Sequence, residues 1–470
     1  MKRSQHLLDG LLFYGFCVLC GQLSSAEDAA PKTCRIVVTD AENGWPVPLI
    51  ELRTAHQMRF VTDNAGVIAC DAAELMGRET WFHIHGHGYE VAADAFGYRG
   101  VRLTPQPGAT LTVKVERKNI AKRLGRLTGG GLFAESQKLG DQRDWIDSPI
   151  VGSDSVQLAE YRGRLMWAWG DTTLSKYPLG IFHASSATTT LLPLKTFQPP
   201  LKPPFVYFRT PDGVPRGVAN VPGPGPTWLS AYFTLTLNGE ERLCATYRKI
   251  KPPLETYEVG LCMWDHTNEE FRPSKKLWNK ESGEQEPKHV PDGHPARWTD
   301  ADGKKWLLFG NPLPKLRCPD SFAGWSDPKN WEPLSPPETL PAAVDGKPIK
   351  LHSGSIAWNA HRQRWVTVFM QHFGKASPFG ELWYAEAKDP LGEWGPVVQI
   401  LTHDNYSFYN PRIQVELTPP DAKFLLFEGT YTQEFANRPQ PTPRYDYNQM
   451  LYRLDLDDPK LAKAKKEIGN

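Results

Sequence analysis

Residues 352–373 read HSGSIAWNAHRQRWVTVFMQHF, and residues 380–400 read GELWYAEAKDPLGEWGPVVQI. They form one unit, in which a polar first strand is followed by apolar strands rich in aromatic residues and then by a turn. Gly and Pro mark the turns, and no helical periodicity separates the strands. The unit therefore predicts a small sheet of short antiparallel strands.

Comparable units recur between residues 150 and 458. They cover residues 153–174, 217–265, 293–334 and 410–458, which makes five units with the one above. Recurring units of about 50 to 70 residues, each with several strands, are typical of a β-propeller. The sequence thus predicts an all-β chain in which residues 150–458 form a five-bladed β-propeller. A pair of β-sandwiches is the alternative.

A separate small domain is expected before these units. Residues 33–118 alternate in the manner of strands through CRIVVTD, PLIELRT and ATLTVKVERK, which predicts a small N-terminal β-sandwich. Its segment VTDAENGWPVPLIELRTAHQMRFVTDNAGV resembles the carboxypeptidase regulatory-like, or transthyretin-like, domains of exported proteins. That resemblance implies an accessory domain rather than a catalytic one.

Three histidines in this domain recur at every second residue, at positions 83, 85 and 87. On one face of a continuous strand, His83, His85 and His87 could share a metal ion. The alternative is that Gly86 and Gly88 interrupt the strand and that the histidines shape a loop. We therefore assign no metal to the functional site, and no cofactor is expected.

The start of the chain has the features of an export signal. A basic start precedes an apolar run from Leu11 to Leu23 that is too short to span a bilayer, and small residues follow it. Residues 1–26 are therefore predicted to be a signal peptide. The mature chain is expected to be secreted or periplasmic, with no membrane segment after signal removal; an uncleaved membrane anchor is the alternative.

Two further stretches are expected to lie outside the compact domains. Residues 119–149 contain the run Gly129-Gly130-Gly131 and no phosphate-binding motif, so they are predicted to be a linker. Residues 459–470 are predicted to be a charged C-terminal tail.

Five cysteines follow the predicted signal peptide, and an oxidising compartment favours their pairing. Cys244 and Cys262 lie equally far from the turn at Pro252-Pro253, so a hairpin would set them face to face. Cys34 and Cys70 belong to strands of the same small domain. Either pair could form a disulfide or stay reduced, and Cys318 is left as a buried thiol.

Composition excludes one class of partner and suggests another. The chain has 54 Lys or Arg and 53 Asp or Glu, and this balance argues against binding of nucleic acid through a basic field. Sixteen Trp and sixteen Tyr are many for 470 residues. These rings either fill β cores or stack on flat ligands such as sugars.

Two segments resemble known enzymes. WYAEAKDPLGEWGPV, residues 383–397, is similar to the outer strands of five-bladed propeller glycosidases of the arabinanase and xylosidase type. GSDSVQLAEYRGRLMWAWGDT, residues 152–172, is similar to the opening of a related bacterial propeller group that includes endo-D-arabinanases. In that group the catalytic carboxylates are an Asp on the opening strand and the Asp of a GDT turn. The resemblance implies these roles for Asp154 and Asp171.

The chemistry supports such a pair, because glycoside hydrolysis needs one protonated and one ionised carboxyl group beside the scissile bond. The alternative is that Asp171 caps a turn through Thr172 and that Asp154 bonds backbone amides. Glu428 follows an apolar strand as Asp171 does, which makes it a third catalytic candidate or a structural acceptor.

Other polar and aromatic residues fall where units begin or strands end. The candidate substrate contacts are Trp169, His294, His352, Asn410 and Arg412. Each could instead be structural, through core packing of the Trp or hydrogen bonds between blades. The segment PTPRYDYNQM, residues 441–450, could close the ring or contact substrate.

These features predict a secreted glycoside hydrolase that acts as a monomer on a polysaccharide or oligosaccharide. The alternatives are a carbohydrate-binding propeller without catalysis and a protein-interaction propeller. The first would keep the aromatic residues without paired carboxylates, whereas the second would expose an apolar rim.

Overall fold

The computed structural model describes residues 32–181, 183–191, 198–436, 442 and 446–464. The predicted signal peptide, residues 1–26, lies outside the described residues, as do residues 465–470 of the predicted tail. Strands dominate throughout, and the two α-helices, α1 (Ala134–Lys138) and α2 (Phe322–Ser326), have five residues each. The all-β prediction is therefore confirmed. Within the described part of the chain, none of the helices has the length and apolar character needed to cross a membrane.

Residues 33–117, here called the N-terminal unit, form two four-stranded sheets. In sheet order the strands are β4 (Val67–Cys70), β1 (Cys34–Asp40), β8 (Thr110–Arg117) and β6 (Tyr89–Glu90), then β3 (Arg59–Val61), β2 (Glu51–Thr54), β5 (Thr80–His85) and β7 (Gly100–Leu103). Burial alternates along β1, so Cys34, Ile36 and Val38 face inward. They meet Leu52 and Phe82 of the other sheet in one apolar core.

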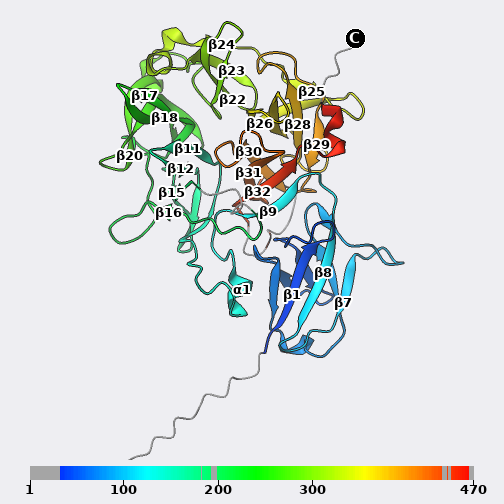
Figure 1. Cartoon of the computed structure of the whole chain (residues 1–470). Coiled ribbons are helices and arrows are strands. Elements are labelled where there is room, and N and C mark those ends of the chain that lie inside the picture. Colours follow the sequence, from blue (N-terminus) through cyan, green and yellow to red (C-terminus); the bar gives the residue numbers. More distant parts are fainter. Residues whose placement is uncertain (1–31, 182, 192–197, 437–441, 443–445, 465–470) are drawn as a thin grey trace, which may run out of the picture.

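Five further sheets of four or five strands lie in the rest of the described chain. In sheet order their strands are β11 (Gln157–Tyr161), β12 (Arg164–Ala168), β15 (Ser186–Thr190) and β16 (Val206–Tyr207); β17 (Thr227–Leu237), β18 (Glu240–Lys251), β19 (Glu255–Asp265) and β20 (Glu270–Asn279); β21 (Ala296–Thr299), β22 (Lys305–Gly310), β23 (Pro314–Pro319) and β24 (Glu332–Pro333); β25 (Thr339–Pro341), β26 (Pro348–Asn359), β27 (Arg364–Gln371), β28 (Leu382–Ala387) and β29 (Val398–Leu401); and β30 (Ser407–Ile413), β31 (Phe424–Thr432), β32 (Asn448–Asp455) and β9 (Lys122–Arg126). We call them together the five-sheet unit. Figure 1 shows its sheets set around one another above the N-terminal unit.

The five sheets share a common centre. Residues of β11, β17, β21, β26 and β30 line one cavity of about 620 Å³. The last sheet also contacts the first, because the Arg412 guanidinium donates a 2.8 Å hydrogen bond to the carbonyl oxygen of Leu158. One strand from each sheet therefore faces the same axis, and residues distant in sequence meet there.

The predicted linker contributes a strand to the last sheet. Within residues 119–149, β9 pairs antiparallel with β32, with Arg126 opposite Met450 and Lys122 opposite Arg453. Leu124 is fully buried in this sheet. The stretch is thus structural, and it joins the beginning of the unit to its end; pairing between strands so far apart in sequence leaves no local signal.

The predicted tail is also partly packed. Its first residues form the 3₁₀ helix η5 (Pro459–Ala464), in which Leu461 and Ala464 are buried. Among the described residues, other 3₁₀ turns lie in connections, at η1 (Ala73–Leu75), η3 (Lys280–Ser282) and η4 (Pro328–Asn330).

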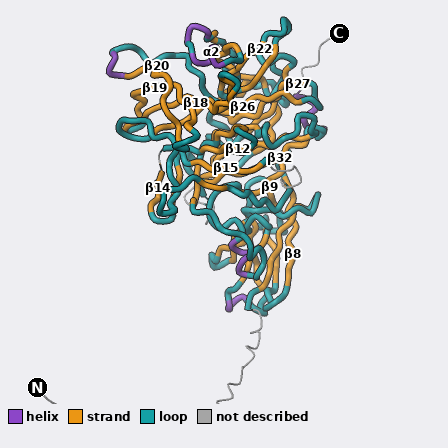
Figure 2. Tube along the Cα trace, turned by 60° about the vertical axis from the view of Figure 1, so that its left-hand side comes forward, coloured by secondary structure: helices purple, strands orange, loops and turns teal. Residues whose placement is uncertain are grey.

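A buried arginine joins the two units. Arg123 of β9 donates to the carbonyl oxygens of Pro48 at 3.0 Å and His87 at 2.6 Å, and to the Tyr452 hydroxyl at 3.1 Å. Because these partners satisfy the buried guanidinium, the N-terminal unit is docked on the last sheet through defined polar contacts. Figure 2 shows the backbone of the two units from another side, with β8 below β9 and β32.

Neither of the two candidate disulfides is formed, since all five described cysteines are free and buried. Cys34 lies directly opposite Cys70 in the β1–β4 pair, yet the thiols are not bonded. Cys262 lies opposite Ala245 rather than Cys244, because Ile250 pairs with Thr256 and Lys249 with Glu258. Tyr257 is therefore an extra residue that shifts the register by one and sends the two thiols to opposite faces of the sheet.

The three histidines of the N-terminal unit have separate surroundings. His83 accepts a 3.3 Å hydrogen bond from the Trp81 indole, while His87 is buried and lies 2.7 Å from the Tyr431 hydroxyl. Strand β5 ends at His85, so His87 belongs to the following turn. Among the described residues, no group of three or more His, Cys, Asp or Glu side chains could hold a metal ion.

Candidate active site

A separate three-stranded sheet positions the two predicted catalytic carboxylates. It consists of β10 (Ile150–Ser153), β13 (Thr172–Leu174) and β14 (Tyr177–Ile181), and Ser153 pairs with Thr172. Asp154 follows β10 and Asp171 precedes β13. The Asp154 amide donates to the Asp171 carbonyl oxygen at 3.1 Å, and the Gly170 amide donates to the Asp154 carbonyl oxygen at 2.9 Å. Backbone pairing thus holds the two aspartates side by side.

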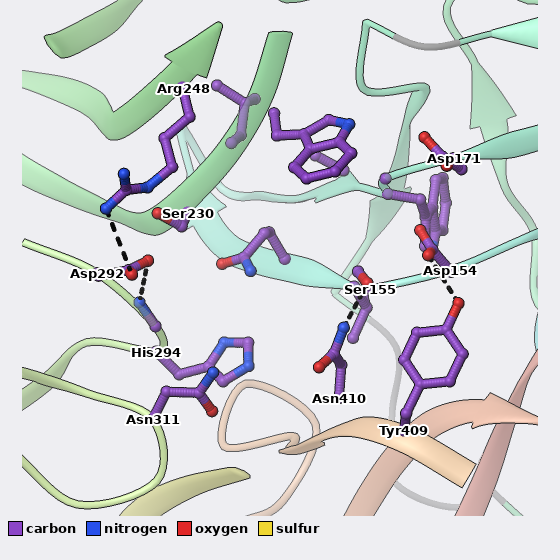
Figure 3. Close-up of a pocket in the computed structure, with 18 of the residues that line it drawn as sticks. Asp154, Ser155, Asp171, Ser230, Arg248, Asp292, His294, Asn311, Tyr409 and Asn410 are labelled. Carbon is purple, nitrogen blue, oxygen red and sulfur yellow. Dashed lines mark hydrogen bonds and ion pairs between the residues drawn. The ribbon is translucent and has the colours of Figure 1, made fainter. Parts of the chain in front are cut away.

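Both aspartates line one pocket of about 500 Å³ near the axis of the five-sheet unit. Its other walls come from the start of β17, the segment before β21, β30 and the connection after β31. Figure 3 shows Asp154 and Asp171 close together on one side, with His294 and Asn311 across the pocket from them. His294 also lines the central cavity, so the pocket lies at one end of that axis.

Asp154 has the surroundings of a protonated carboxyl group. Its Oδ2 accepts a 2.8 Å hydrogen bond from the Tyr409 hydroxyl, whereas its buried Oδ1 has no protein partner. Burial, and then the charge of Asp171, raise the pKa of Asp154 to about 7, although the Tyr409 and Tyr447 hydroxyls oppose this rise. A group that still carries its proton near neutral pH, with one oxygen free, can serve as a general acid.

Asp171 is half-buried, and burial raises its pKa, while the Trp228 indole opposes that rise. Its Oδ1 is also buried without a protein partner. Because the charge of Asp171 contributes to the raised pKa of Asp154, Asp171 loses its proton first. The pair can therefore hold one proton on Asp154 beside an ionised Asp171.

The position of the Asp154 carboxyl group requires a glycine at residue 170. A Cβ atom added at residue 170 would lie 2.3 Å from Oδ1 of Asp154, far inside van der Waals contact. Any larger residue there must displace either the backbone or the catalytic candidate. The lack of space for a side chain beside Asp154 thus explains the glycine of the GDT turn.

The third carboxylate predicted from sequence lies elsewhere. Glu428 is fully buried within β31, opposite Arg412, and lines neither the pocket nor the central cavity. Burial raises the pKa of Glu428 to about 8. The prediction placed the strand end at Phe427, but β31 continues to Thr432.

Glu434, which the sequence reasoning missed, is the acidic residue that follows the true end of β31. It lines the pocket, and burial, then Asp446, then Asp171 raise the pKa of its carboxyl group. Its only sequence signal is its place in the connection between two apolar strands.

Three of the predicted substrate contacts line the pocket. Asn410 donates a 2.7 Å hydrogen bond to the Ser155 hydroxyl. His294 has an Nδ1 without a protein partner, and burial together with the nearby Arg412 lowers the pKa of His294 to about 3, so its imidazole is neutral. Trp169 lines the pocket from within the core, where its ring stacks on Trp167 at 6.1 Å between centroids.

The other two predicted contacts are outside the pocket. Arg412 lines the central cavity, where Glu416 pairs with it at 2.6 Å and holds it in the structure. His352 stacks on His372 at 5.1 Å between centroids, beyond the pocket lining. Arg412 and His352 each lie near the beginning of a unit, as expected. However, a residue there can face the pocket, the central cavity or the outer surface, depending on how far along the axis it lies.

Several pocket residues were not predicted. Besides Glu434, they include Tyr409, Trp228, Ser230, Arg248, Asp292 and Asn311. Tyr409 adjoins the predicted Asn410, and Tyr447 lies in the segment that was expected to close the ring or contact substrate. Arg248 reaches Asp292 at 3.9 Å, and no sequence motif joins these two residues.

A buried network links the N-terminal unit to this pocket. The His87 ring lies 4.8 Å from that of Tyr406, whose hydroxyl donates to Asp446. Asp446 also accepts a 2.8 Å hydrogen bond from the Gln433 amide, and it directly precedes Tyr447 in the chain. The backbone segments that contain Glu434 and Tyr447 are thus held in place by a chain of contacts from His87 through Tyr406 to Asp446.

Comparisons with known proteins give similarity in structure only. No family model matches the sequence, and no curated protein matches it. An exo-1,5-α-L-arabinanase from a bovine ruminal metagenomic library has a TM-score of 0.38 at 10% identity, with 66% of this chain and 94% of that chain covered. The GH43_1 enzyme from Xanthomonas citri complexed with xylotriose has a TM-score of 0.34 at 10% identity, with 64% and 86% covered. A GH43 β-1,3-galactosidase with galactodeoxynojirimycin has a TM-score of 0.37 at 9% identity, with 66% and 91% covered.

Proposed function

We propose that this chain is a glycoside hydrolase that cleaves a polysaccharide with Asp154 as general acid and Asp171 as base or nucleophile. The observation that carries the proposal is the pair itself. Two carboxyl groups lie side by side in one pocket, and the surroundings keep the proton on Asp154 while Asp171 ionises. Two neighbouring carboxyl groups in opposite protonation states are what glycoside hydrolysis requires.

Each step has a residue to perform it. Asp154 donates its proton to the departing glycosidic oxygen, while the Tyr409 hydroxyl donates a hydrogen bond to Oδ2 and fixes the rotamer. Asp171 either attacks the sugar carbon or activates a water molecule, and the ionised carboxylate stabilises the developing positive charge. Asn410 and the neutral His294 are placed to bind sugar hydroxyl groups.

The architecture suits this activity. In our proposal the five sheets are the blades of a five-bladed β-propeller, and the N-terminal unit is an accessory sandwich of the transthyretin-like type. The enzyme would be exported through residues 1–26 and would act outside the cytoplasm as a monomer. The defined contacts around Arg123 support a structural role for the accessory unit.

The test is a screen of soluble polysaccharides, including arabinan, xylan and galactan, for new reducing ends. The wild-type chain is expected to cleave at least one of them, and Asp154→Asn and Asp171→Asn are each expected to reduce turnover by orders of magnitude. Both replacements keep the shape of the side chain and remove its ionisable proton. Cleavage by both variants at the wild-type rate would refute the assignment.

A further inference from the structure

A line of aromatic rings leads from the pocket across the surface. It begins at Tyr409, the donor to Asp154, whose ring lies 5.7 Å from that of Phe435. Phe435 lies 5.8 Å from Phe379, and Phe379 lies 5.4 Å from Phe373. We call the rings beyond Tyr409 the aromatic strip; its members are Phe435, Phe379, Phe373, His372 and His352.

Two phenyl rings of the strip are open to solvent, and Phe379 between them is partly buried. Phe373 is 65% exposed and Phe435 is 62% exposed. Contiguous apolar surface of this kind marks a place where a ligand or partner binds. Since Phe435 also lines the pocket, the strip is continuous with the proposed active site.

Backbone strain gives a second, independent reason to assign a function. Phe373 has φ of 53° and Phe435 has φ of 61°, in the left-handed region that a bulky residue rarely adopts. Glycine or asparagine would occupy these positions at a lower cost. Strained residues that bury little of their own surface are not explained by folding, and they are concentrated at ligand sites.

The chemistry of the strip limits the classes of ligand that could bind to it. Its members are three phenyl rings and two imidazoles, and burial, His372 and the charges of Lys315 and Lys350 lower the pKa of His352. The strip itself therefore offers flat apolar faces and the neutral imidazole of His352, and none of its members carries a carboxylate. Such a surface suits sugar rings, which present CH groups on a face and hydroxyl groups at the edge.

We infer that the aromatic strip binds the part of a neutral polysaccharide chain that extends beyond the pocket. This inference rests on the proposed function, because the polymer would enter the pocket at Tyr409 and continue over Phe435, Phe379 and Phe373. It names the substrate as a chain of several sugars rather than a short glycoside.

The experiment measures binding without requiring cleavage. The chain with Asp154→Asn is run on native gels that contain each polysaccharide of the panel, alone and combined with Phe373→Ala. Phe96→Ala is the matched control, because Phe96 is 86% exposed and lies in the N-terminal unit, away from the strip. Phe373 does not line the pocket, so its replacement leaves the catalytic groups in place.

We expect at least one polysaccharide to retard the Asp154→Asn chain, with Phe373→Ala weakening that binding about three- to tenfold and Phe96→Ala leaving it unchanged. Phe373→Gly should weaken binding equally and unfold at no lower temperature, because glycine relieves the backbone strain. This variant separates loss of the ring from loss of the fold.

Equal binding by the Phe373 and Phe96 variants would overturn the inference. Absence of retardation by every polysaccharide would overturn it as well. In that case cleavage of short glycosides by the wild-type chain still decides the proposed function separately. If the enzyme is active, Phe373→Ala should raise KM for the polymer and leave kcat/KM for a small aryl glycoside unchanged.

Discussion

Replacement of Asp154 by Asn should make the protein more stable while it abolishes cleavage of the polysaccharide. Burial beside Asp171 raises the pKa of Asp154 from 3.8 to about 7. At about 1.4 kcal/mol for each pH unit, ionising this group in the folded state costs about 4 kcal/mol. Asn keeps the volume and the contact with Tyr409 and has no charge to bury, so the variant escapes this cost.

The sign of the effect follows from where the proton is bound. Below pH 3.8 Asp154 is protonated in both the folded and unfolded states, and the variant and wild type should be equally stable. Between pH 3.8 and about 7 the folded wild type retains a proton that the unfolded chain has lost, so wild-type stability declines as pH rises. Above about pH 7 the advantage of Asp154→Asn should reach its full value.

The assay is denaturant unfolding of both proteins at several pH values from 4 to 9, with the difference in unfolding free energy plotted against pH. Glu428→Gln is the matched control, because burial raises the pKa of Glu428 to about 8 outside the pocket. It should also stabilise the protein at high pH, but it should keep activity. A difference for Asp154→Asn that is absent or independent of pH would refute the reasoning.

Three further outcomes are expected. The value of kcat/KM should fall above about pH 7, where Asp154 loses its proton, and a profile that stays flat to pH 9 would contradict its role as the acid. Gly170→Ala should reduce kcat by at least tenfold with a smaller change in KM, since the new Cβ would meet Oδ1 of Asp154; wild-type kcat in steady-state assays would refute this. Asp446→Asn should lower activity by loosening the residues around Glu434 and Tyr447, and hydrogen exchange should rise there; unchanged exchange would contradict the positioning role.

Local sequence patterns predicted much of this structure. Alternating apolar residues predicted the all-β class, and the resemblance around GSDSVQLAEYRGRLMWAWGDT pointed to Asp154 and Asp171. The structure sets those two side by side because Ser153 pairs with Thr172. Such pairing lies within one short segment, where turns and alternation are visible in the sequence.

The failures arose where one residue or a distant strand decides the outcome. The extra residue Tyr257 separated Cys244 from Cys262, and a strand longer than its apolar run kept Glu428 away from the pocket. Strand β9 was assigned to a linker because its partner, β32, lies near the other end of the chain. Register and long-range pairing depend on the assembled fold, and local patterns do not encode them.

The acid and base roles can be separated by the leaving group of the substrate. The substrate for this test is an aryl glycoside of the released sugar whose phenol is strongly acidic. Its phenolate leaving group departs without protonation. On this substrate Asp154→Asn should retain much of the wild-type rate of the glycosylic bond cleavage step, although it fails on the polysaccharide, while Asp171→Asn should fail on both. Equal loss for Asp154→Asn on both substrates, or retention by Asp171→Asn, would contradict the assignment of Asp154 as acid and Asp171 as its ionised partner.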